Sequence, residues 1–245
     1  MAAGRGAIIM VDGSVLEGGG QILRNTVALS AILGLQVEIR RIRRGRAKPG
    51  LKAQHQCGIE LVSRMAGARL VGCERNSTEV DFDASQGRGL AGGDYIADTK
   101  TAGSCTLLAQ TSLLPALFAT SPCKLDLRGG TDAGMAPPAD YLAHVLLPNL
   151  RHFGVTPDLT LCTRGFFPRG GGRIILSTTP VTSLRPVVMD EPGAVEKVRC
   201  FAFAAGKVLP TVARAAADRV LARLAARFGD LTPSEAAAAA SEPLR

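Results

Sequence analysis

The chain has 245 residues, and its 46% hydrophobic content is enough for a large core, which excludes a chain that is disordered throughout. Lysine and arginine outnumber aspartate and glutamate by 29 to 21, so the formal net charge is +8. This balance favours polyanionic partners such as nucleic acids, nucleotides or an anionic membrane surface, although an ordinary basic protein would have the same composition.

Segments for export or membrane insertion are not expected. No apolar run reaches the roughly 20 residues that a membrane-spanning helix needs, and the most apolar stretch, residues 111–120, contains Pro115. The apolar stretch before Asp12 is too short for a signal peptide. The six cysteines form no CxxC pair, and no histidine lies at metal-ligand spacing from them. We therefore expect free thiols in a reducing compartment, the nucleus or the cytosol.

Residues 1–90 have the pattern of a strand–helix–strand–helix–strand–strand unit. A glycine-rich turn at residues 17–20 separates a short apolar run from a helical pattern that ends at Gly34, a typical helix terminator. A basic Pro/Gly loop, residues 43–50, leads to a second helical pattern. The expected elements are strand 7–11, helix 22–33, strand 37–42, helix 54–65, strand 69–73 and strand 78–82.

Residues 91–182 repeat this order. Residues 102–105 take the place of the first glycine turn, and residues 129–138 take the place of the basic loop. The expected elements are helix 106–118, strand 124–128, helix 140–153, strand 159–162 and strand 173–177. Two tandem βαβαββ units predict an α/β (α+β) architecture in which helices lie against sheets.

The character of the sequence changes after Pro180, so residues 183–245 form a third expected region. Residues 183–196 read as a proline-containing connection, residues 198–204 alternate like a strand, and residues 210–228 form an amphipathic helix. One strand and one helix cannot complete a sheet. This region is therefore expected to be the beginning of a further domain.

The glycine turn and the residues after it, from Glu17 to Arg24, form the first candidate ligand site. Glycines let a backbone approach a phosphate, and a helix N-terminus presents N–H groups to an anion. Arg24, about one turn into the helix, could add a bidentate contact. The segment has neither the GxxxxGK[ST] pattern of a Walker A loop nor the GxGxxG pattern of a dinucleotide-binding turn. Tight packing of helix on sheet is the alternative explanation.

The basic segment at residues 40–50 is the second candidate. Six of the nine residues from Arg40 to Lys48 are basic, and Arg43 and Arg46 come where the strand ends and the loop begins. Ligands of α/β folds usually bind at such strand ends, and a phosphate backbone is the natural partner. The alternative is a solvated basic edge strand, on which charges prevent aggregation.

Two further segments, residues 129–140 and 164–173, are rich in glycine and proline. The three consecutive glycines from Gly170 indicate either close packing or a ligand, and a proline face near residue 137 could form one side of an adenine slot. Among the histidines, His55 follows the basic loop and is a candidate ligand contact, whereas His144 and His152 are expected to be structural. No catalytic triad and no metal cluster is evident in the sequence.

Together these segments resemble one family. The strings VDGSVLEGGGQILR, IRRGRAKPGLKAQH, DTKTAGSCTLLAQ, GGTDAGMAPPADY and RGFFPRGGG are similar to those of the RNA 3′-terminal phosphate cyclase family, and DTKTAG resembles its eukaryotic branch. The resemblance implies three βαβαββ repeats like the C-terminal domain of translation initiation factor three, with a small domain inserted between the second and third repeats. Residues 183–245 would then be the beginning of the inserted domain, without the third repeat.

The resemblance also implies a reaction of the ATP-dependent, AMP-forming ligase class, in RNA processing. A histidine attacks the α-phosphate of ATP, with a divalent metal ion (Mg²⁺ or Mn²⁺), and AMP then passes to the 3′-phosphate of RNA. The neighbouring 2′-hydroxyl displaces AMP and leaves a 2′,3′-cyclic phosphate. The implied partners are ATP and RNA with a 3′-phosphate end, in the nucleus (nucleoplasm) or the cytoplasm and not at a membrane, and the oligomeric state stays open.

By the same resemblance, Gln110 and Pro137 match adenylate-pocket positions. The positions that match residues expected to bind the phosphate or the RNA end are Glu17, Arg24, Arg43, Arg46, Gln54 and His55. The family's nucleophilic histidine lies in a segment resembling H-x-x-D-Q, and none of the three histidines here has that context. The catalytic residue is therefore unknown in this chain, which we expect not to become adenylylated by itself.

Two other functions stay open. A non-catalytic, cyclase-like ribosome-assembly factor that binds RNA and protein is expected to have lost the EGGGQILR and adenylate-pocket residues, whereas Glu17, Arg24 and Gln110 are present here. An enzyme similar to the carboxyvinyl transferases would bind an anionic small molecule through similar repeats. The RGFFPRGGG segment favours the cyclase family over that second alternative.

Overall fold

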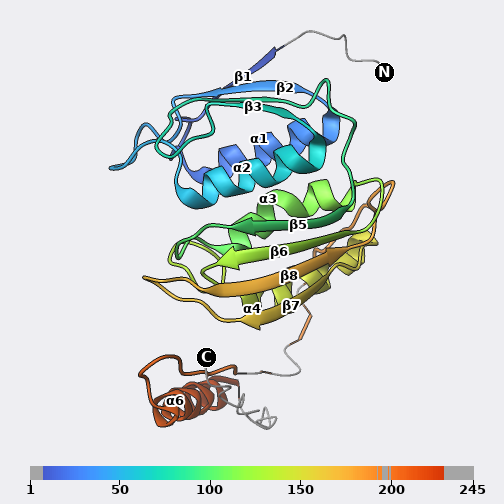
Figure 1. The fold of residues 1–245 in the computed structure, drawn as a ribbon. Helices are drawn as coiled ribbons and strands as arrows, with labels where there is room; N and C mark the ends of the chain where they lie inside the picture. Colours follow the sequence, from blue (N-terminus) through green and yellow to red (C-terminus); the bar gives the residue numbers. More distant parts are fainter. Residues whose placement is uncertain (1–7, 192, 195–197, 199, 229–245) are drawn as a thin grey trace. The chain divides into compact units, whose positions relative to one another are not determined.

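The computed structural model describes residues 8–191, 193, 194, 198 and 200–228. The chain divides into two compact units, one up to Val187 and one from Val188 onward. The first unit contains two four-stranded sheets and the helices that cover them (Figure 1). The α/β class predicted from the sequence is confirmed.

The first sheet mixes parallel and antiparallel pairs. Its strands, in the order β1-β2-β4-β3, are β1 (Ile8–Asp12), β2 (Gln36–Arg40), β4 (Val80–Asp83) and β3 (Arg69–Val71). β1 is parallel to β2, and β4 is antiparallel to both of its neighbours. Because side chains alternate along a strand, Val37, Ile39, Val80 and Phe82 are buried on one face while charged residues lie on the other.

The second sheet has the same strand order and the same directions. Its strands, in the order β5-β6-β8-β7, are β5 (Gly93–Asp98), β6 (Cys123–Gly129), β8 (Gly172–Thr178) and β7 (Asp158–Thr163). Strand β5 is not predicted by the sequence pattern, because its few apolar residues follow two glycines. It pairs in parallel with β6 over its whole length, so tertiary pairing rather than local pattern establishes it.

Three helices pack on one another between the two sheets (Figure 1). They are α1 (Gly20–Leu33), α2 (Ala53–Ala66) and α3 (Cys105–Leu117), close to their predicted spans. α1 and α2 both end at glycines with a left-handed backbone, Gly34 and Gly67, which residues with a side chain rarely adopt. All the residues of α3 except Gln110 and Leu114 are buried.

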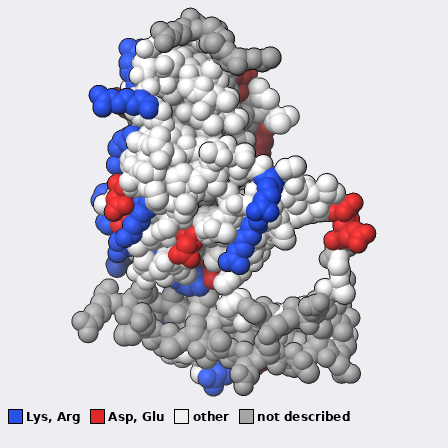
Figure 2. Space-filling model, turned by 90° about the vertical axis from the view of Figure 1, so that its right-hand side faces the viewer, with Lys and Arg blue, Asp and Glu red and all other residues white. Residues whose placement is uncertain are grey.

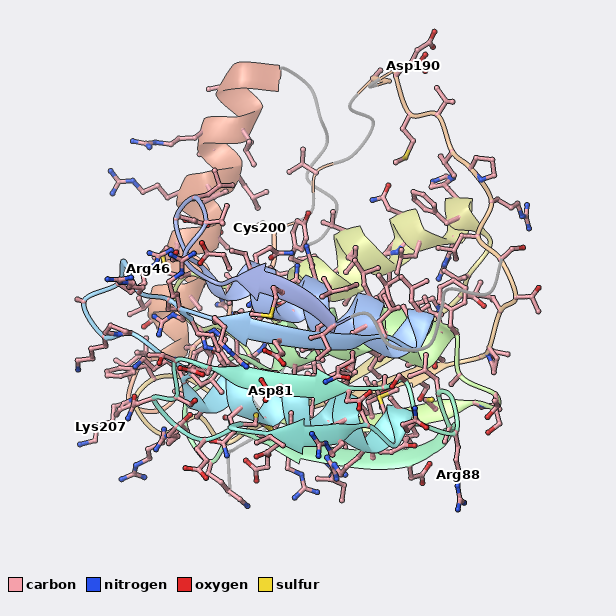
Figure 3. All side chains as sticks on the ribbon, turned by 90° about the horizontal axis from the view of Figure 1, so that it is seen from above. Arg46, Asp81, Arg88, Asp190, Cys200 and Lys207 are labelled. Atoms are coloured by element: carbon pink, nitrogen blue, oxygen red, sulfur yellow. The ribbon has the colours of Figure 1, made fainter. Side chains whose placement is uncertain are left out.

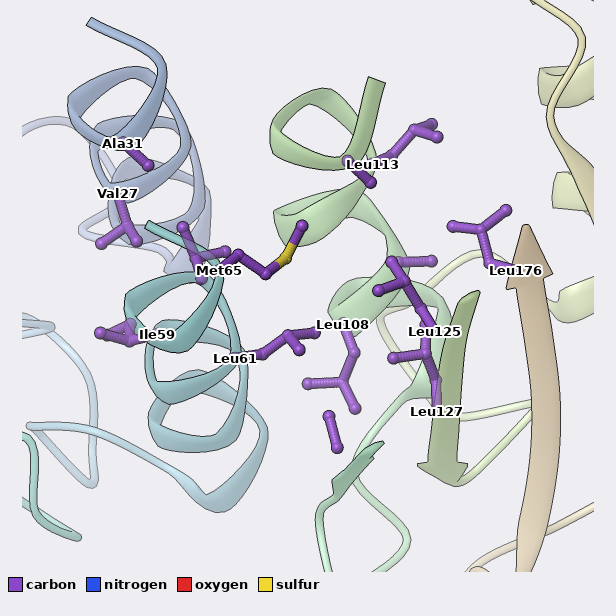
Figure 4. Close-up of a cluster of buried hydrophobic side chains, with 14 of the residues drawn as sticks. Val27, Ala31, Ile59, Leu61, Met65, Leu108, Leu113, Leu125, Leu127 and Leu176 are labelled. Carbon is purple, nitrogen blue, oxygen red and sulfur yellow. The ribbon is translucent and has the colours of Figure 1, made fainter. Parts of the chain in front are cut away.

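A contiguous hydrophobic core runs through this helical layer to the second sheet. Met65 of α2 lies where α1, α2 and α3 meet, Leu61 of α2 points toward Leu108 of α3, and Leu125 and Leu127 of β6 lie on the other side of α3 (Figure 4). Full burial of such a side chain stabilises a fold by about 1.5–3 kcal/mol. The core thus joins residues from both halves of the first unit.

Residues 139–153 form a continuous helical segment, as predicted, but its winding changes along its length. The parts are α4 (Ala139–Tyr141), the π-helical turn η1 (Leu142–Leu146), α5 (Leu147–Leu150) and the 3₁₀ turn η2 (Arg151–Phe153). Pro148 accounts for the change, because it has no N–H to donate to the carbonyl four residues earlier and its ring crowds that carbonyl.

The second unit contains helix α6 (Pro210–Phe228), which has the predicted bounds. The strand predicted at residues 198–204 is wrong for the described residues of that range, which have no regular secondary structure. No strand of the described residues pairs with them, and a lone extended segment has no partner for its backbone groups. Among the described residues, no helix combines the length and the apolar character that crossing a membrane requires.

Candidate functional site

The glycine turn joins the end of β1 to the start of α1. Gly18 has a φ of 54°, and Gly19 at the N-cap position has no side chain that could cap the first N–H groups of the helix. The first turn of α1 contains no acidic residue. Its N–H groups and the positive end of the helix dipole therefore favour an external anion.

His55, in the first turn of α2, lies directly against the start of α1. A Cβ atom added to Gly20 would overlap Nε2 of His55 and would lie 2.9 Å from Nη1 of Arg24. The missing side chain at Gly20 thus leaves room for the imidazole and the guanidinium beside the helix N-terminus. The structure brings these two predicted site residues together.

The His55 ring is buried and held in one tautomer. The backbone N–H of Lys52 donates to Nδ1 of His55 over 3.1 Å, so the proton of the neutral ring is on Nε2, the atom that faces Gly20. Burial, together with the charges of Arg43, Arg24 and Lys52, lowers the pKa of His55 from 6.5 to about 4. At neutral pH the ring is therefore an uncharged hydrogen-bond donor.

Arg24 has an unsatisfied hydrogen-bond donor. Its Nη2 donates to Oε1 of Gln21 over 2.9 Å, but its Nε is buried without a hydrogen-bond partner among the described residues. Burial also lowers the pKa of this guanidinium below its ordinary value. A buried cationic donor without a partner is costly, and an anion at this place would supply the missing acceptor.

The basic segment divides into cations that form ion pairs within the fold and cations at the site. Arg40 pairs with Glu38 and Asp81 on the outer face of the first sheet, at 2.6 and 2.5 Å, and Arg41 pairs with Asp12. The alternative of a basic edge strand is wrong, because β2, which ends at Arg40, pairs with β1 on one side and β4 on the other. The charges of Arg40 and Arg41 are at least partly neutralised by these pairs within the first unit.

Arg43 and Arg46 behave differently from each other. Arg43 has a φ of 54°, and its Nη1 donates to the carbonyls of Lys48 and Gly50 at 3.0 and 2.9 Å, so it shapes the loop. Burial and the charge of Arg46 lower the pKa of Arg43. Arg46 reaches the glycine turn instead, where its Nη2 lies 3.2 Å from Oε2 of Glu17. Both partners of that pair are exposed, so an incoming anion can compete with the carboxylate.

Gln54 connects this site to the second half of the unit. Its Oε1 accepts a hydrogen bond of 2.9 Å from the backbone N–H of Ser104, the N-cap residue of α3. The Ser104 hydroxyl in turn accepts from the N–H groups of Thr106 and Leu107, each at 3.2 Å. The N-termini of α1, α2 and α3 therefore lie at the same end of the unit.

Gln110 and Pro137, the two predicted nucleotide contacts, are linked through Thr106. The hydroxyl of Thr106 donates to the carbonyl of Pro137 over 2.7 Å, and Gln110 lies one helical turn further along α3. Gln110 is exposed and Pro137 is half-buried. One helical turn rises about 5.4 Å, so Gln110 lies close along α3 to the contact that Thr106 makes with Pro137.

The RGFFPRGGG segment packs closely against two loops beside α3. A Cβ atom on Gly165 would overlap the backbone N of Gly172, and one on Gly170 would overlap the carbonyl oxygen of Thr101. The backbone N–H of Thr131 donates to the carbonyl of Gly165 over 2.8 Å. Of the two explanations left open by the sequence, these glycines support close packing.

Arg164 fixes the loop that contains Pro137. Its two Nη atoms donate to the two carboxylate oxygens of Asp140 at 2.7 and 2.8 Å, and Asp132 lies 3.6 Å from the same guanidinium. Bidentate pairs of this kind hold both position and angle. The ion pair therefore positions the backbone around Pro137.

Two labelled arginines mark the two ends of the first unit. Arg46 lies at one end and Arg88 at the other (Figure 3), and the centre of the face opposite the site carries few charged side chains (Figure 2). The described residues include no group of three or more His, Cys, Asp or Glu side chains that could hold a metal ion. The site therefore fits a polyanion better than a metal ion held by the protein.

The amino-acid sequence matches one family of known proteins. A sequence model of the RNA 3′-terminal phosphate cyclase family matches residues 15–243. The chain belongs to this family.

Named relatives in this cyclase family are similar over most of the chain. The chain is 42% identical over 205 residues to a protein of Dictyostelium discoideum named "Probable RNA 3′-terminal phosphate cyclase", an alignment that covers 83% of this chain and 47% of the relative. It is 42% identical over 206 residues to an RNA 3′-terminal phosphate cyclase of Drosophila melanogaster, covering 84% and 56%. A cyclase of Archaeoglobus fulgidus is 47% identical over 173 residues, covering 71% and 52%. The chain thus spans about half the length of these relatives.

The structure adds residues that the sequence did not single out. Lys52 orients His55 through its backbone, and Ser104 and Thr106 join the second half of this cyclase-family chain to the site. Ser104 had a detectable signal, because a serine directly before an apolar helix is a typical N-cap. The roles of Lys52 and Thr106 depend on contacts between segments distant in sequence, and no local pattern indicates them.

The buried His55 gives a prediction about acid stability. Because its pKa is lowered from 6.5 to about 4, the neutral ring contributes stability that is complete above pH 6.5 and is lost as the pH falls toward 4. The difference corresponds to about 3 kcal/mol. Urea unfolding at pH 7 and at pH 4.5 should show a larger loss for the wild-type chain than for His55→Gln, whose amide does not titrate. Equal losses in the two proteins would contradict the buried, neutral ring.

Proposed function

We propose that this chain binds the 3′-phosphate end of RNA together with ATP and takes part in forming a 2′,3′-cyclic phosphate. The observation that supports this most directly is the anion site at the start of α1, where the buried Nε of Arg24 lacks a partner and His55 presents a neutral donor. Family membership supplies the substrate class. The donors at the start of α1 support the place that we assign to the phosphate.

In this proposal the side chains of the site have separate tasks. Arg24, the Nε2–H group of His55 and the first N–H groups of α1 bind oxygens of a phosphate at the start of α1. The guanidinium of Arg46 leaves the carboxylate of Glu17 and binds the phosphate instead. Arg43 and Gln54 hold the basic loop and the start of α3 in place through their contacts with backbone atoms.

Gln110 and Pro137 border the surface that we assign to the adenine of ATP. The half-buried Pro137 offers a flat apolar contact, and the exposed amide of Gln110 can read the polar edge of a base. Once AMP is attached to the 3′-phosphate, the 2′-hydroxyl oxygen forms a bond to that phosphorus. The bond to AMP breaks, AMP leaves, and the hydroxyl proton passes to solvent.

The AMP acceptor is not assigned to a described histidine. Nδ1 of His55 is occupied by the Lys52 N–H and its Nε2 carries the proton, so neither nitrogen offers a lone pair to ATP. We assign no step to a divalent metal ion: the described residues include no cluster of three or more His, Cys, Asp or Glu side chains for it, and such an ion would be held chiefly by the phosphates of ATP. Covalent label from ATP on His55, His144 or His152 would contradict this assignment.

Arg46→Ala tests the RNA-end proposal. Loss of one charge-assisted contact should weaken binding of a 3′-phosphorylated oligoribonucleotide at least about tenfold and should reduce the slope of log affinity against log salt by roughly 0.7. Arg88→Ala, at the opposite end of the unit, is the matched control and should change neither quantity. Fluorescence anisotropy over a range of salt concentrations gives both values. Unchanged affinity and slope in the Arg46 variant would show that the basic loop is solvated and does not bind the RNA end.

A further inference from the structure

The most exposed large apolar side chains of the first unit lie in three loops. Within its described residues, Met135 is 97% exposed, Leu16 is 96% exposed and Phe167 is 85% exposed. The loops that contain them follow the C-terminal ends of β6, β1 and β7. Single exposed apolar residues are ordinary. Leu16 belongs to the segment that leads into the glycine turn of the candidate site, and Phe167 lies in a turn whose packing contacts lead to that site.

Phe167 is presented by a closed turn. The backbone N–H of Gly170 donates to the carbonyl of Phe166 over 2.7 Å, so that Phe167, Pro168 and Arg169 form the exposed tip between them. At the base of the turn, the tight packing of Gly165 on Gly172 leaves no room for a side chain. The aromatic ring is therefore displayed on an anchored support rather than on a long loop.

The composition of this tip matches single-stranded nucleic acid. Every base has a flat face that stacks on an aromatic ring, and an adjacent arginine can contact a phosphate or stack as well. Arg169 is exposed and forms no ion pair with the described residues. In the chain, Phe167 is followed directly by Pro168 and Arg169, so the aromatic ring and the cation belong to the same exposed tip.

The position of the turn connects it to the proposed RNA end. Gly170 packs against residues 101 and 102, the loop just before Ser104, and Ser104 is hydrogen-bonded to Gln54 beside His55. The turn is also tied to the Pro137 loop through Thr131 and Gly165. The turn that contains Phe167 therefore lies near an RNA strand whose 3′ end is bound at the start of α1.

We propose that Phe167 and Arg169 form a stacking platform for an unpaired base close to the 3′ end of a single-stranded RNA. The proposal rests on the proposed function, because it takes the RNA end to be bound at the start of α1. Phe167 supplies the stacking surface, and Arg169 supplies charge to the adjacent backbone. The platform would bind RNA without regard to sequence, since stacking is available to every base.

The test compares Phe167→Ala, Phe167→Trp and Leu33→Ala in the 245-residue chain with 3′-phosphorylated oligoribonucleotides. The alanine variant should bind roughly tenfold more weakly with an unchanged salt slope, and the tryptophan variant should keep the affinity. Leu33, 62% exposed at the far end of α1, is the control for removal of an exposed apolar side chain and should have no effect. A further set of oligonucleotides lacks a single base, at a different position close to the 3′ end in each. For one of these positions, wild-type and Phe167→Ala chains should bind with the same affinity, because the base that stacks on the ring is then missing.

The outcomes separate this proposal from the one on which it depends. If the wild-type chain does not prefer 3′-phosphorylated RNA to 3′-hydroxyl RNA, the proposed function fails. If it has that preference and Phe167→Ala binds with unchanged affinity, the platform is wrong while the proposed function stands. A loss that is the same with every base-lacking oligonucleotide would also overturn the platform, because the ring would then act on something other than a base.

Discussion

Replacing Gly20 by alanine is expected to abolish phosphate binding at the start of α1. The added Cβ atom would overlap Nε2 of His55 and crowd Nη1 of Arg24, so both donors would have to move away from the place where the anion fits. Hydrogen bonds to charged groups contribute about 1.5–3 kcal/mol each. Loss of two of them predicts binding of 3′-phosphorylated RNA weaker by at least about 100-fold, measured by isothermal titration calorimetry.

Gly45→Ala is the matched control for this change. Gly45 lies in the basic loop, and a Cβ atom there would meet no atom within 4 Å. Its variant should bind RNA as the wild-type chain does. Gly20→Ala should also lose about 1–3 kcal/mol of unfolding free energy, because His55 is buried and its displacement strains the packing. A Gly20 variant that binds normally would mean that the anion is bound elsewhere.

The largest effect on folding is expected from Gly165→Ala. A Cβ atom there would overlap the backbone N of Gly172 and would lie 2.6 Å from the carbonyl oxygens of Gly129 and Gly170. These are backbone atoms, which cannot swing aside as a flexible side chain can. We expect a loss of at least about 3 kcal/mol in the free energy of unfolding, measured by urea denaturation followed by circular dichroism.

Gly134→Ala provides the comparison. Gly134 belongs to the neighbouring loop, and a Cβ atom there would have open space. This variant should unfold within about 0.5 kcal/mol of the wild-type chain. If Gly165→Ala were as stable as Gly134→Ala, the close packing of the RGFFPRGGG segment would not be what requires glycine at position 165.

The sequence alone predicts the elements whose signals are local. The span of α1 follows from its apolar periodicity and from Gly34, which ends it, and α2 and α3 are also found close to their expected spans. Strand β5 is missed, because its place in the sheet depends on β6 rather than on its own residues. The strand expected at residues 198–204 is wrong because an alternating apolar and polar pattern does not make a strand by itself. A strand also needs a neighbouring strand with which to form hydrogen bonds, and none of the described strands pairs with this segment.

The candidate site likewise combines residues that the sequence indicates with contacts that only the folded structure reveals. The sequence marks Gly20, Arg24, Arg46 and His55 as residues suited to bind an anion. Whether they meet is a matter of three-dimensional packing, which places His55 against Gly20 and leaves the Nε of Arg24 without a partner. The tautomer of His55 depends on the backbone of Lys52, and residue type alone gives no indication of it.

The burial of α3 has a consequence for the order in which the protein matures during synthesis. This helix belongs to the second half of the first unit, yet it completes the layer in which α1 and α2 are packed. The first sheet and its helices therefore cannot reach their final packing on the ribosome until residues beyond Leu117 have left the exit tunnel. Until then the sides of α1 and α2 that pack against α3 are exposed. A chaperone that recognises exposed hydrophobic surface would bind the nascent chain at these two helices.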